Sequence, residues 1–174
     1  MKIAIIGYSG SGKSTLARKL GEKYGLPVLH LDTVHWLPGW KARERDEKDR
    51  IIKEYLDTHV SWVIDGTYSR FSFERRMEEA DVIIELLFGR VSCYIRALKR
   101  HFKYRGTNRP DMTVGCPEKM DWEFTKWIFV DGRKKSTREK FASVRDTYPN
   151  KTLVIKNQRA LDRLDISDFA GKDR

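Results

Sequence analysis

Short apolar runs alternate with longer segments of helical spacing along the chain. Runs rich in β-branched residues predict five strands, at 2–6, 27–31, 62–64, 82–88 and 152–155. Between these runs, apolar residues recur three or four positions apart. This spacing predicts helices at 13–24, 43–59, 72–80, 91–103, 118–130 and 137–147, and a short helix around Leu161 closes the chain. The run 82–88 is the most apolar and is expected near the centre of a sheet.

Strands that alternate with helices favour a parallel sheet with helices on both faces. We therefore expect a three-layer α/β/α fold. One domain should span residues 1–174, because we find no repeat, low-complexity tract or flexible linker. Glycines and prolines cluster between residues 104 and 118, where we expect a mobile loop.

The segment between the first strand and the first helix reads GYSGSGKS over residues 7–14, which matches the phosphate-binding pattern G-x-x-x-x-G-K-[ST]. Glycines let backbone N–H groups wrap an anion closely, and the following helix adds the positive end of its dipole. Lys13 reaches the β- and γ-phosphates, and the Ser14 hydroxyl suits Mg²⁺. A glycine turn with a chance lysine is the alternative, which the strand–loop–helix context disfavours. We expect ATP to be bound by Gly7, Ser9, Gly10, Ser11, Gly12, Lys13, Ser14 and Thr15.

Two carboxylates, Asp32 and Asp65, follow the second and third predicted strands. In an open parallel sheet, ligands bind outside the carboxyl ends of the strands, at the edge where Gly7 also lies. Asp32 is therefore the candidate catalytic base for a hydroxyl acceptor, and Asp65 is the candidate Mg²⁺ ligand, acting through water. The alternative is that either residue caps the turn or helix that follows its strand.

Positive charge is concentrated in one part of the chain. The sequence has 35 Lys and Arg against 25 Asp and Glu, a net charge of +10, which favours anionic partners such as nucleotide phosphates or nucleic acid. Residues 86–110 contain no acid and hold Arg90, Arg96, Lys99, Arg100, Lys103, Arg105 and Arg109.

The predicted helix 91–103 has an apolar stripe made of Val91, Ile95, Leu98 and Phe102. Arg96, Arg100 and Lys103 lie three or four positions apart on the opposite side, so they project toward one target. We expect Arg96 and Arg100 to stabilise a phosphoryl group during transfer. A solvated basic face is the alternative. Arg109 borders the mobile loop and would move inward as that loop closes.

No apolar stretch approaches the roughly 20 residues that span a bilayer. The N-terminal apolar run is too short for a signal-peptide core, so we expect a cytoplasmic protein with no membrane partner. Cys93 and Cys116 are the only cysteines, and their number and spacing favour free thiols over a disulfide or a zinc site.

Aromatic residues gather near the motif segments. Trp36, Trp40, Tyr68 and Trp122 fall in predicted loops or at their edges, where a planar wall would suit a base or sugar ring. Trp36 is the substrate contact that we expect from this group. The alternative is that these side chains pack a small acceptor-binding subdomain. Trp62 and Trp127 are expected in the core.

Together, these segments resemble the adenylate kinase-related P-loop kinases and, more narrowly, the topology modulation protein family. The resemblance covers most of the chain. Besides residues 7–14, it rests on segments 31–40 (LDTVHWLPGW), 62–68 (WVIDGTY), 109–112 (RPDM), 115–118 (GCPE) and 121–124 (DWEF). The phosphate-binding pattern alone marks only a superfamily, whereas the tryptophan-bearing segments are much narrower.

The resemblance implies a five-stranded parallel sheet in the order 2-3-1-4-5. It also implies an acceptor-binding helical region at 33–60, a lid at 104–118, and a substrate contact from Arg70 after the third strand. Arg70 follows Asp65 by five residues, one more than in adenylate kinases, and the Phe-Pro of that family is missing here. These departures argue against AMP as the acceptor.

We predict an ATP-dependent phosphotransferase that acts on a small molecule or nucleotide, in which Arg70, Arg75 and Arg76 would help to bind an anionic acceptor. A hydroxyl acceptor would use Asp32 as base, whereas a phosphate acceptor needs positioning but no base, and the sequence leaves both open. The alternatives are an ATP-dependent regulator of DNA topology and an ATP-binding protein without turnover. Nucleic acid is the less favoured partner, because no recognition-helix, zinc-finger or RNA-binding signature is present.

Overall fold

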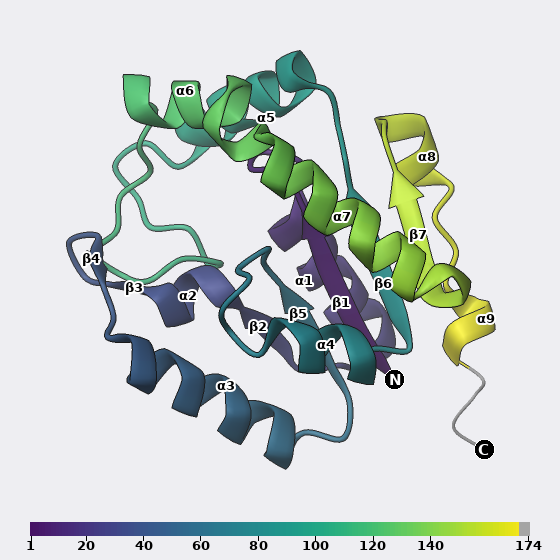
Figure 1. Ribbon diagram of the computed structural model, residues 1–174. Helices are drawn as coiled ribbons and strands as arrows, with labels where there is room; N and C mark the ends of the chain where they lie inside the picture. The colour runs from purple at the N-terminus through teal and green to yellow at the C-terminus, as the bar shows by residue number, and fades with distance from the viewer. Residues whose placement is uncertain (171–174) are drawn as a thin grey trace.

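Five parallel strands form the central sheet of the computed structural model, which describes residues 1–170 (Figure 1). Their order across the sheet is β2 (Val28–His30), β5 (Trp62–Asp65), β1 (Lys2–Gly7), β6 (Val82–Leu86) and β7 (Thr152–Ile155). The register places Ile5 between Asp65 and Ile84, so the carboxyl ends of the three middle strands reach the same edge. Numbered among themselves, these strands have the predicted order 2-3-1-4-5.

Helices cover both faces of the sheet, as expected (Figure 1). One face packs against α1 (Lys13–Tyr24), α5 (Arg90–Lys103), α6 (Trp122–Phe129), α8 (Gln158–Asp162) and α9 (Ser167–Ala170). The other face packs against α2 (Leu31–His35), α3 (Arg45–Thr58), α4 (Phe73–Glu79) and α7 (Lys135–Thr147). Alternate residues of β1 serve the two cores, Ile3 and Ile5 on one side and Ala4 and Ile6 on the other.

Residues 31–42 differ from the prediction. The second strand ends at His30, and Asp32 lies in the first turn of α2 instead of at a strand end. An antiparallel hairpin follows, β3 (Trp36–Leu37) and β4 (Lys41–Ala42), turned at Gly39 and Trp40, which both have positive φ. Elements of two to five residues are too short to produce a periodic pattern, so sequence spacing could not predict them.

The helix after the lid also starts later than predicted. It was expected from residue 118, but α6 begins at Trp122, because the Asp121 side chain caps it by accepting a hydrogen bond from the Phe124 N–H at 2.8 Å. Two short 3₁₀ helices flank α7, at Asp131–Arg133 (η1) and Pro149–Lys151 (η2).

The apolar stripe of α5 faces solvent rather than the core. Val91 and Phe102 are each 63% exposed and Ile95 is 45% exposed, whereas Cys93 and Ala97 face the core. A Cβ atom on Gly10 would lie 2.4 Å from the Cys93 carbonyl oxygen, so the helix backbone touches the phosphate loop directly. Only small side chains fit on the contacting face, and the large apolar ones therefore face solvent.

Among the described residues, no helix is both long and apolar enough to cross a membrane. Cys93 and Cys116 are both buried and free, as the sequence predicted.

Candidate functional site

The phosphate loop connects β1 to α1 with a strained backbone that glycine accommodates. Gly7 has φ 143°, and a Cβ there would lie 2.3 Å from the Leu86 carbonyl oxygen. Gly12 precedes α1 in a left-handed conformation, with φ 98°. The Thr67 hydroxyl accepts from the Gly7 N–H at 3.0 Å and donates to the Gly7 carbonyl at 2.9 Å. These bonds tie the loop after β5 to the start of the cradle.

Lys13 is held inside this cradle. Its Nζ donates to the Tyr8 carbonyl oxygen at 3.0 Å. Burial lowers the pKa of Lys13, and the charges of Asp32 and Asp65 act in the opposite direction. An anion entering the cradle would meet a cation whose desolvation has already occurred on folding.

Ser14 and Asp65 form the part of the site that suits a divalent cation. Ser14 Oγ donates to Asp65 Oδ2 at 2.9 Å, while His30 Nδ1 bonds the other oxygen of the same carboxylate. Asp65 is only 4% exposed. Burial lowers the pKa of His30, but its hydrogen bond and charge interaction with Asp65 outweigh that effect and raise it overall.

A hydroxyl and a carboxylate are oxygen ligands of the kind that Mg²⁺ prefers. Within residues 1–170, no three His, Cys, Asp or Glu side chains converge into an all-protein metal cage. The arrangement of Ser14 and Asp65 therefore fits a cation held chiefly by phosphate oxygens and water, which is usual for Mg²⁺ at nucleotide sites.

Asp32 lies near Lys13 but belongs to α2. Its Oδ1 accepts a hydrogen bond from the Tyr68 hydroxyl at 2.7 Å. Burial and the Asp32 charge both raise the pKa of Tyr68, so the phenol stays protonated and donates. Over the described part of the chain, Asp32 Oδ2 makes no hydrogen bond to protein, which leaves one carboxylate oxygen for an acceptor molecule.

Arg96 and Arg100 face the site from α5. The Arg96 guanidinium lies 4.4 Å above the Phe88 ring centroid, and its Nη1 lies 3.4 Å from the position of a Cβ on Gly12. It also donates to Gln158 Oε1. Lys103 is exposed beside the Tyr104 ring, so the expectation that it joins the two arginines was wrong.

A charge triad, with Arg109 and Glu118 buried and Arg100 partly exposed, links α5 to the lid. Arg100 donates to Glu118 Oε1 at 2.7 Å from Nε, and Arg109 Nε lies 3.2 Å from Glu118 Oε2. Burial lowers the pKa of Arg100, Arg109 adds to this effect, and Glu118 opposes it. Arg109 is thus buried within the lid and paired with a carboxylate.

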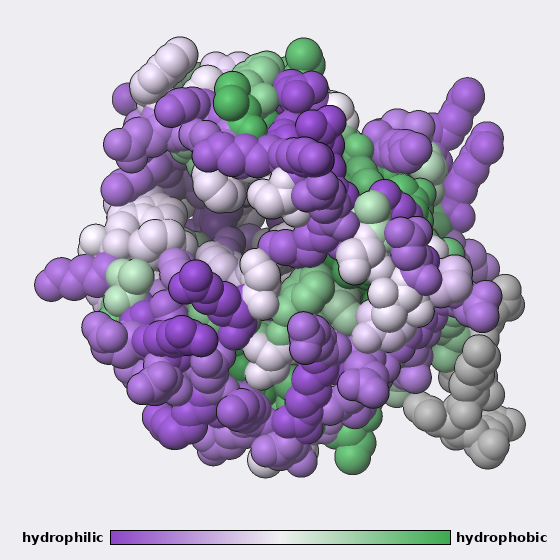
Figure 2. All heavy atoms as spheres, viewed as in Figure 1, coloured by the Kyte–Doolittle hydropathy of each residue, from purple (hydrophilic) through white to green (hydrophobic). Residues whose placement is uncertain are grey.

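The lid loop is docked on the β3–β4 hairpin. The Thr113 hydroxyl donates to the Trp36 carbonyl at 2.6 Å, and the Gly39 N–H donates to the Gly115 carbonyl at 2.9 Å. The lid and the acceptor-side hairpin therefore meet above the sheet edge. Figure 2 shows a hollow in the surface beside the contact between the lid and the hairpin, below α6.

Aromatic rings line the acceptor side. His35 lies 4.4 Å from the Trp36 ring centroid and 4.9 Å from that of Tyr68, and Trp36 lies 5.4 Å from that of Trp40. These rings pack on one another next to Asp32. Trp122 is 77% exposed on α6 and lies outside this cluster.

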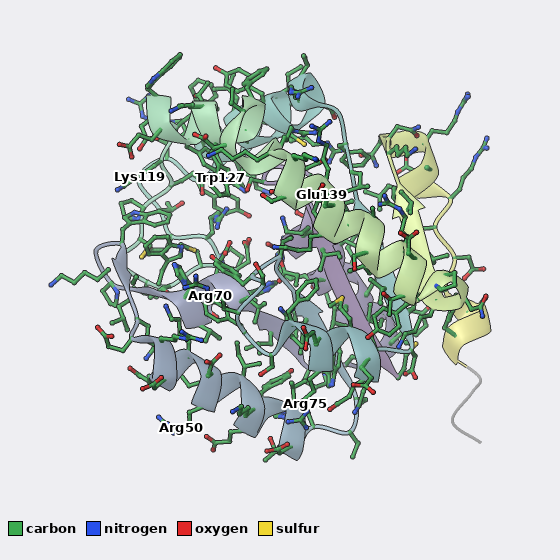
Figure 3. All side chains as sticks on the ribbon, in the orientation of Figure 1. Arg50, Arg70, Arg75, Lys119, Trp127 and Glu139 are labelled. Atoms are coloured by element: carbon green, nitrogen blue, oxygen red, sulfur yellow. The ribbon has the colours of Figure 1, made fainter. Side chains whose placement is uncertain are left out.

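Of the acceptor-side arginines, only Arg70 keeps its guanidinium available. It is exposed and, among residues 1–170, forms no hydrogen bond or ion pair; Figure 3 shows it on the loop before α4, beside the hollow. Arg75 pairs with Asp57 at 2.7 Å and with Glu79 at 2.5 Å. Arg76 is fully buried and donates to backbone carbonyls, so neither Arg75 nor Arg76 faces an acceptor.

Several site residues escaped the sequence analysis. Trp127 was expected in the core, but it is 49% exposed and its indole N–H donates to Ser9 Oγ at 3.0 Å (Figure 3). The Arg133 guanidinium lies 3.7 Å above the Tyr8 ring centroid and donates to the Phe88 carbonyl at 2.8 Å. Trp62 is fully buried, as expected. Thr67, which bonds Gly7, also escaped the analysis. It is the one residue of this group that the sequence could have indicated, because it lies in the 62–68 motif segment.

One more cation reaches the acceptor side. Lys140 on α7 donates to Ser69 Oγ at 2.7 Å, next to Arg70. Burial lowers the pKa of Lys140, and the positive charge of Arg76 lowers it further.

No protein-family model and no curated protein matches this sequence. Solved structures do match. Shikimate kinase from Acinetobacter baumannii, in complex with shikimate, aligns with a TM-score of 0.56 and 17% identity, over 92% of this chain and 87% of that one. Deoxyadenosine kinase from M. mycoides with bound dATP aligns with a TM-score of 0.51 and 16% identity, over 97% and 95%. At this identity the likeness establishes the fold alone, which this chain shares with both of these structures.

Proposed function

We propose that the protein is an ATP-dependent phosphotransferase that acts on a hydroxyl group of a small molecule. One observation carries this proposal: Lys13, the Ser14–Asp65 pair and Asp32 converge at the carboxyl edge of the sheet, with Arg96 and Arg100 facing them. A phosphate cradle that contains a lysine, a carboxylate that can bind Mg²⁺ and a carboxylate with one free oxygen are the parts that phosphoryl transfer requires.

In the proposed reaction, the acceptor hydroxyl oxygen forms a bond to the γ-phosphorus while the bond from that phosphorus to the β–γ bridging oxygen breaks. The hydroxyl proton passes to Asp32 Oδ2, and ADP leaves. Lys13, Arg96 and Arg100 offset the negative charge on the phosphoryl oxygens, which grows during transfer. Tyr68 holds Asp32 in place through Oδ1. When bound at Ser14 and Asp65, Mg²⁺ would neutralise charge on the β- and γ-phosphates.

A hydroxyl acceptor fits better than a phosphate acceptor. Arg75 and Arg76 are both engaged within the protein, which leaves Arg70 and Lys140 as acceptor-side cations. Two cations beside an aromatic cluster would suit a hydroxyl compound that carries a ring and one anionic group. The two solved kinases hold shikimate and dATP, which supports a small acceptor opposite a nucleotide.

The alternative, a regulator of DNA topology, would use the basic segment 86–110 as a nucleic-acid surface. Arg96, Arg100 and Arg109 are instead engaged within the protein, Arg96 by Gln158 and the other two by Glu118, which favours the kinase. Membership of the topology modulation protein family is part of the kinase proposal and rests on the motif segments alone. A cytoplasmic location is also part of it and rests on the short apolar run at the N-terminus.

The proposal is tested by ADP release from MgATP across a panel of sugars, nucleosides and hydroxy acids. With an accepted substrate, Asp32→Asn should lower kcat by about 10²- to 10⁴-fold while ATP affinity is kept. Lys13→Ala should lose most turnover as well, since it removes a phosphate contact. Asp146→Asn, on the exposed side of α7, is the matched control and should behave as wild type. Unchanged kinetics of Asp32→Asn with every accepted substrate would remove this residue from the mechanism.

A further inference from the structure

An apolar stripe on α5 faces solvent. It consists of Val91, Ile95, Leu98 and Phe102, of which Val91, Ile95 and Phe102 are among the most exposed large apolar side chains of the described residues. Leu98 is half-buried and lies outside both hydrophobic cores. Figure 2 shows apolar side chains reaching the surface over α5 and α6, at the top of the view. An apolar stripe exposed along one side of a helix is typical of an interaction surface.

The spacing of the stripe indicates what covers it. Its residues are four, three and four positions apart, which is the alternation of two heptads in a coiled-coil seam. The pattern is the same in both directions about the point between Arg96 and Ala97. An antiparallel copy of α5 would therefore set Val91 against Phe102 of the second copy, and Ile95 against Leu98 of the second copy. A contact of this type closes under two-fold symmetry.

The flanking positions are compatible with such a pair. Ser92 and Lys99 border the stripe on one side, and Tyr94 and His101 border it on the other. In the antiparallel arrangement, Lys99 meets Ser92 of the second copy rather than another lysine. Lys99 is the only permanent cation at these four positions. Arg96 and Arg100 are not among them and point to the phosphate loop.

We propose that two copies of this chain pair through α5 in an antiparallel, two-fold arrangement. The inference does not depend on the proposed function. A 14-residue helix is roughly 21 Å long, which is short for an interface that commonly buries about 800 Å² per partner. The dimer should therefore dissociate on dilution. Val130, 56% exposed after α6 and next to the Arg90–Phe129 bond, extends the apolar surface.

Pairing would also steady the site. The opposite side of α5 carries Arg96 and Arg100, and the Cys93 backbone approaches Gly10 closely. A second copy that packs on α5 would therefore restrict its motion and hold the two arginines in position beside the phosphate loop. The dimer should therefore turn over faster than the monomer if the arginines act in catalysis.

Sedimentation velocity across a concentration series tests the pairing. The wild type should shift from one to two copies as concentration rises. Ile95→Glu combined with Phe102→Glu should stay a monomer at every concentration, with an unchanged circular dichroism spectrum because both residues are exposed. Val60→Glu, at a 90% exposed residue between α3 and β5, is the matched control and should dimerise normally. A wild type that is monomeric up to its solubility limit, or a dimer that survives the double substitution, would overturn the proposal.

The direction of the pair is tested by cysteine cross-linking. Val91→Cys combined with Phe102→Cys should give a covalent dimer on mild oxidation, whereas either single variant should not. Eleven residues of helix separate these positions by roughly 16 Å, too far for a bond within one chain. The native cysteines are buried. Cross-linking of the single variants would indicate a parallel pair and contradict this arrangement. A monomer that binds phosphatidylglycerol vesicles through the stripe would assign the surface to lipid and also overturn it.

Discussion

At the scale of single residues, buried ionisable side chains determine how the site is oriented and how stable the fold is. Asp65 is held by two neighbours, Ser14 and His30, and so is oriented toward the phosphate loop before any ligand arrives. Arg76 and Glu85 are buried as deeply, but Arg76 donates to backbone carbonyls and Glu85 accepts from Arg145, so neither bonds a group that is proposed to react. Their contributions are therefore expected in stability rather than in turnover.

Because Glu85 is buried, we predict that the free energy of unfolding depends on pH. It is fully buried on β6, with Oε2 accepting from Arg145 at 2.7 Å, and burial raises its pKa above the ordinary 4.5 despite that partner. The folded state therefore retains a proton that the unfolded state releases first. The stabilisation is complete below pH 4.5 and is lost as pH rises through the folded pKa.

The measurement is urea unfolding of the wild type and Glu85→Gln from pH 4 to 8. The free energy of unfolding of Glu85→Gln relative to wild type should increase with pH, because the amide cannot ionise. Glu54→Gln, exposed on α3, should show a flat difference. A flat or falling difference for Glu85→Gln would mean that Arg145 fully compensates the buried charge.

We predict that truncation of the Arg76 side chain causes a large loss of stability. Its guanidinium donates to the carbonyls of Phe71 at 2.8 Å and Tyr68 at 2.8 Å, and burial lowers its pKa to about 9. Arg76→Met keeps the volume but leaves these carbonyls unpaired, at about 1–3 kcal/mol each. We expect the free energy of unfolding to fall by about 3 kcal/mol or more. Arg75→Met should cost less than about 1 kcal/mol, because its ion pairs are at the surface. Equal losses for the two variants would contradict a structural role for Arg76.

Single residues also show how far sequence reasoning reaches. Lys13, Ser14 and Asp65 were predictable because a local motif or a strand end fixes their place. Trp127 and Arg133 were not, because each contacts the phosphate loop from more than a hundred residues away, through a helix and a 3₁₀ turn with no motif of their own.

At the scale of elements, α5 connects the chemistry to the surface. One side carries Arg96 and Arg100 toward the phosphate loop, a second packs Cys93 and Ala97 on the core, and a third exposes the apolar stripe. Periodicity identified the helix and its stripe correctly. It could not say which side faces inward, because that depends on the close approach to Gly10.

The arginine side of α5 gives a prediction that separates kinase from nucleic-acid binder. Replacing both Arg96 and Arg100 with Ala should lower turnover by about 10²-fold or more, with a smaller change in nucleotide affinity, since charge grows in the transition state. Lys99→Ala with Lys103→Ala removes the same charge from the exposed side and should leave turnover unchanged. Full turnover in the arginine variant would argue for the rival function. So would loss of DNA affinity with a salt slope smaller by about 0.9 per lost phosphate contact.

At the scale of the whole molecule, the parallel sheet brings the site together. Residues 7, 32 and 65 are distant in sequence, yet β1, β5 and the end of β2 deliver them to one edge. Strand alternation predicted a parallel sheet, and the resemblance to adenylate kinase-related P-loop kinases implied its strand order. The contact of the lid with the β3–β4 hairpin was not, because it joins two irregular segments through backbone carbonyls that no side-chain pattern reports.

Phosphoryl transfer itself is the central claim, and following the γ-phosphate tests it most directly. The wild type would be incubated with γ-labelled ATP, Mg²⁺ and pooled hydroxyl acceptors, and the label would be traced by chromatography. We predict that it appears in an acceptor phosphate ester, in an amount equal to the ADP formed, and that Asp32→Asn slows this transfer by about 10²- to 10⁴-fold. Label that stays in ATP despite tight nucleotide binding, or that appears only as inorganic phosphate with every acceptor, would contradict the kinase function.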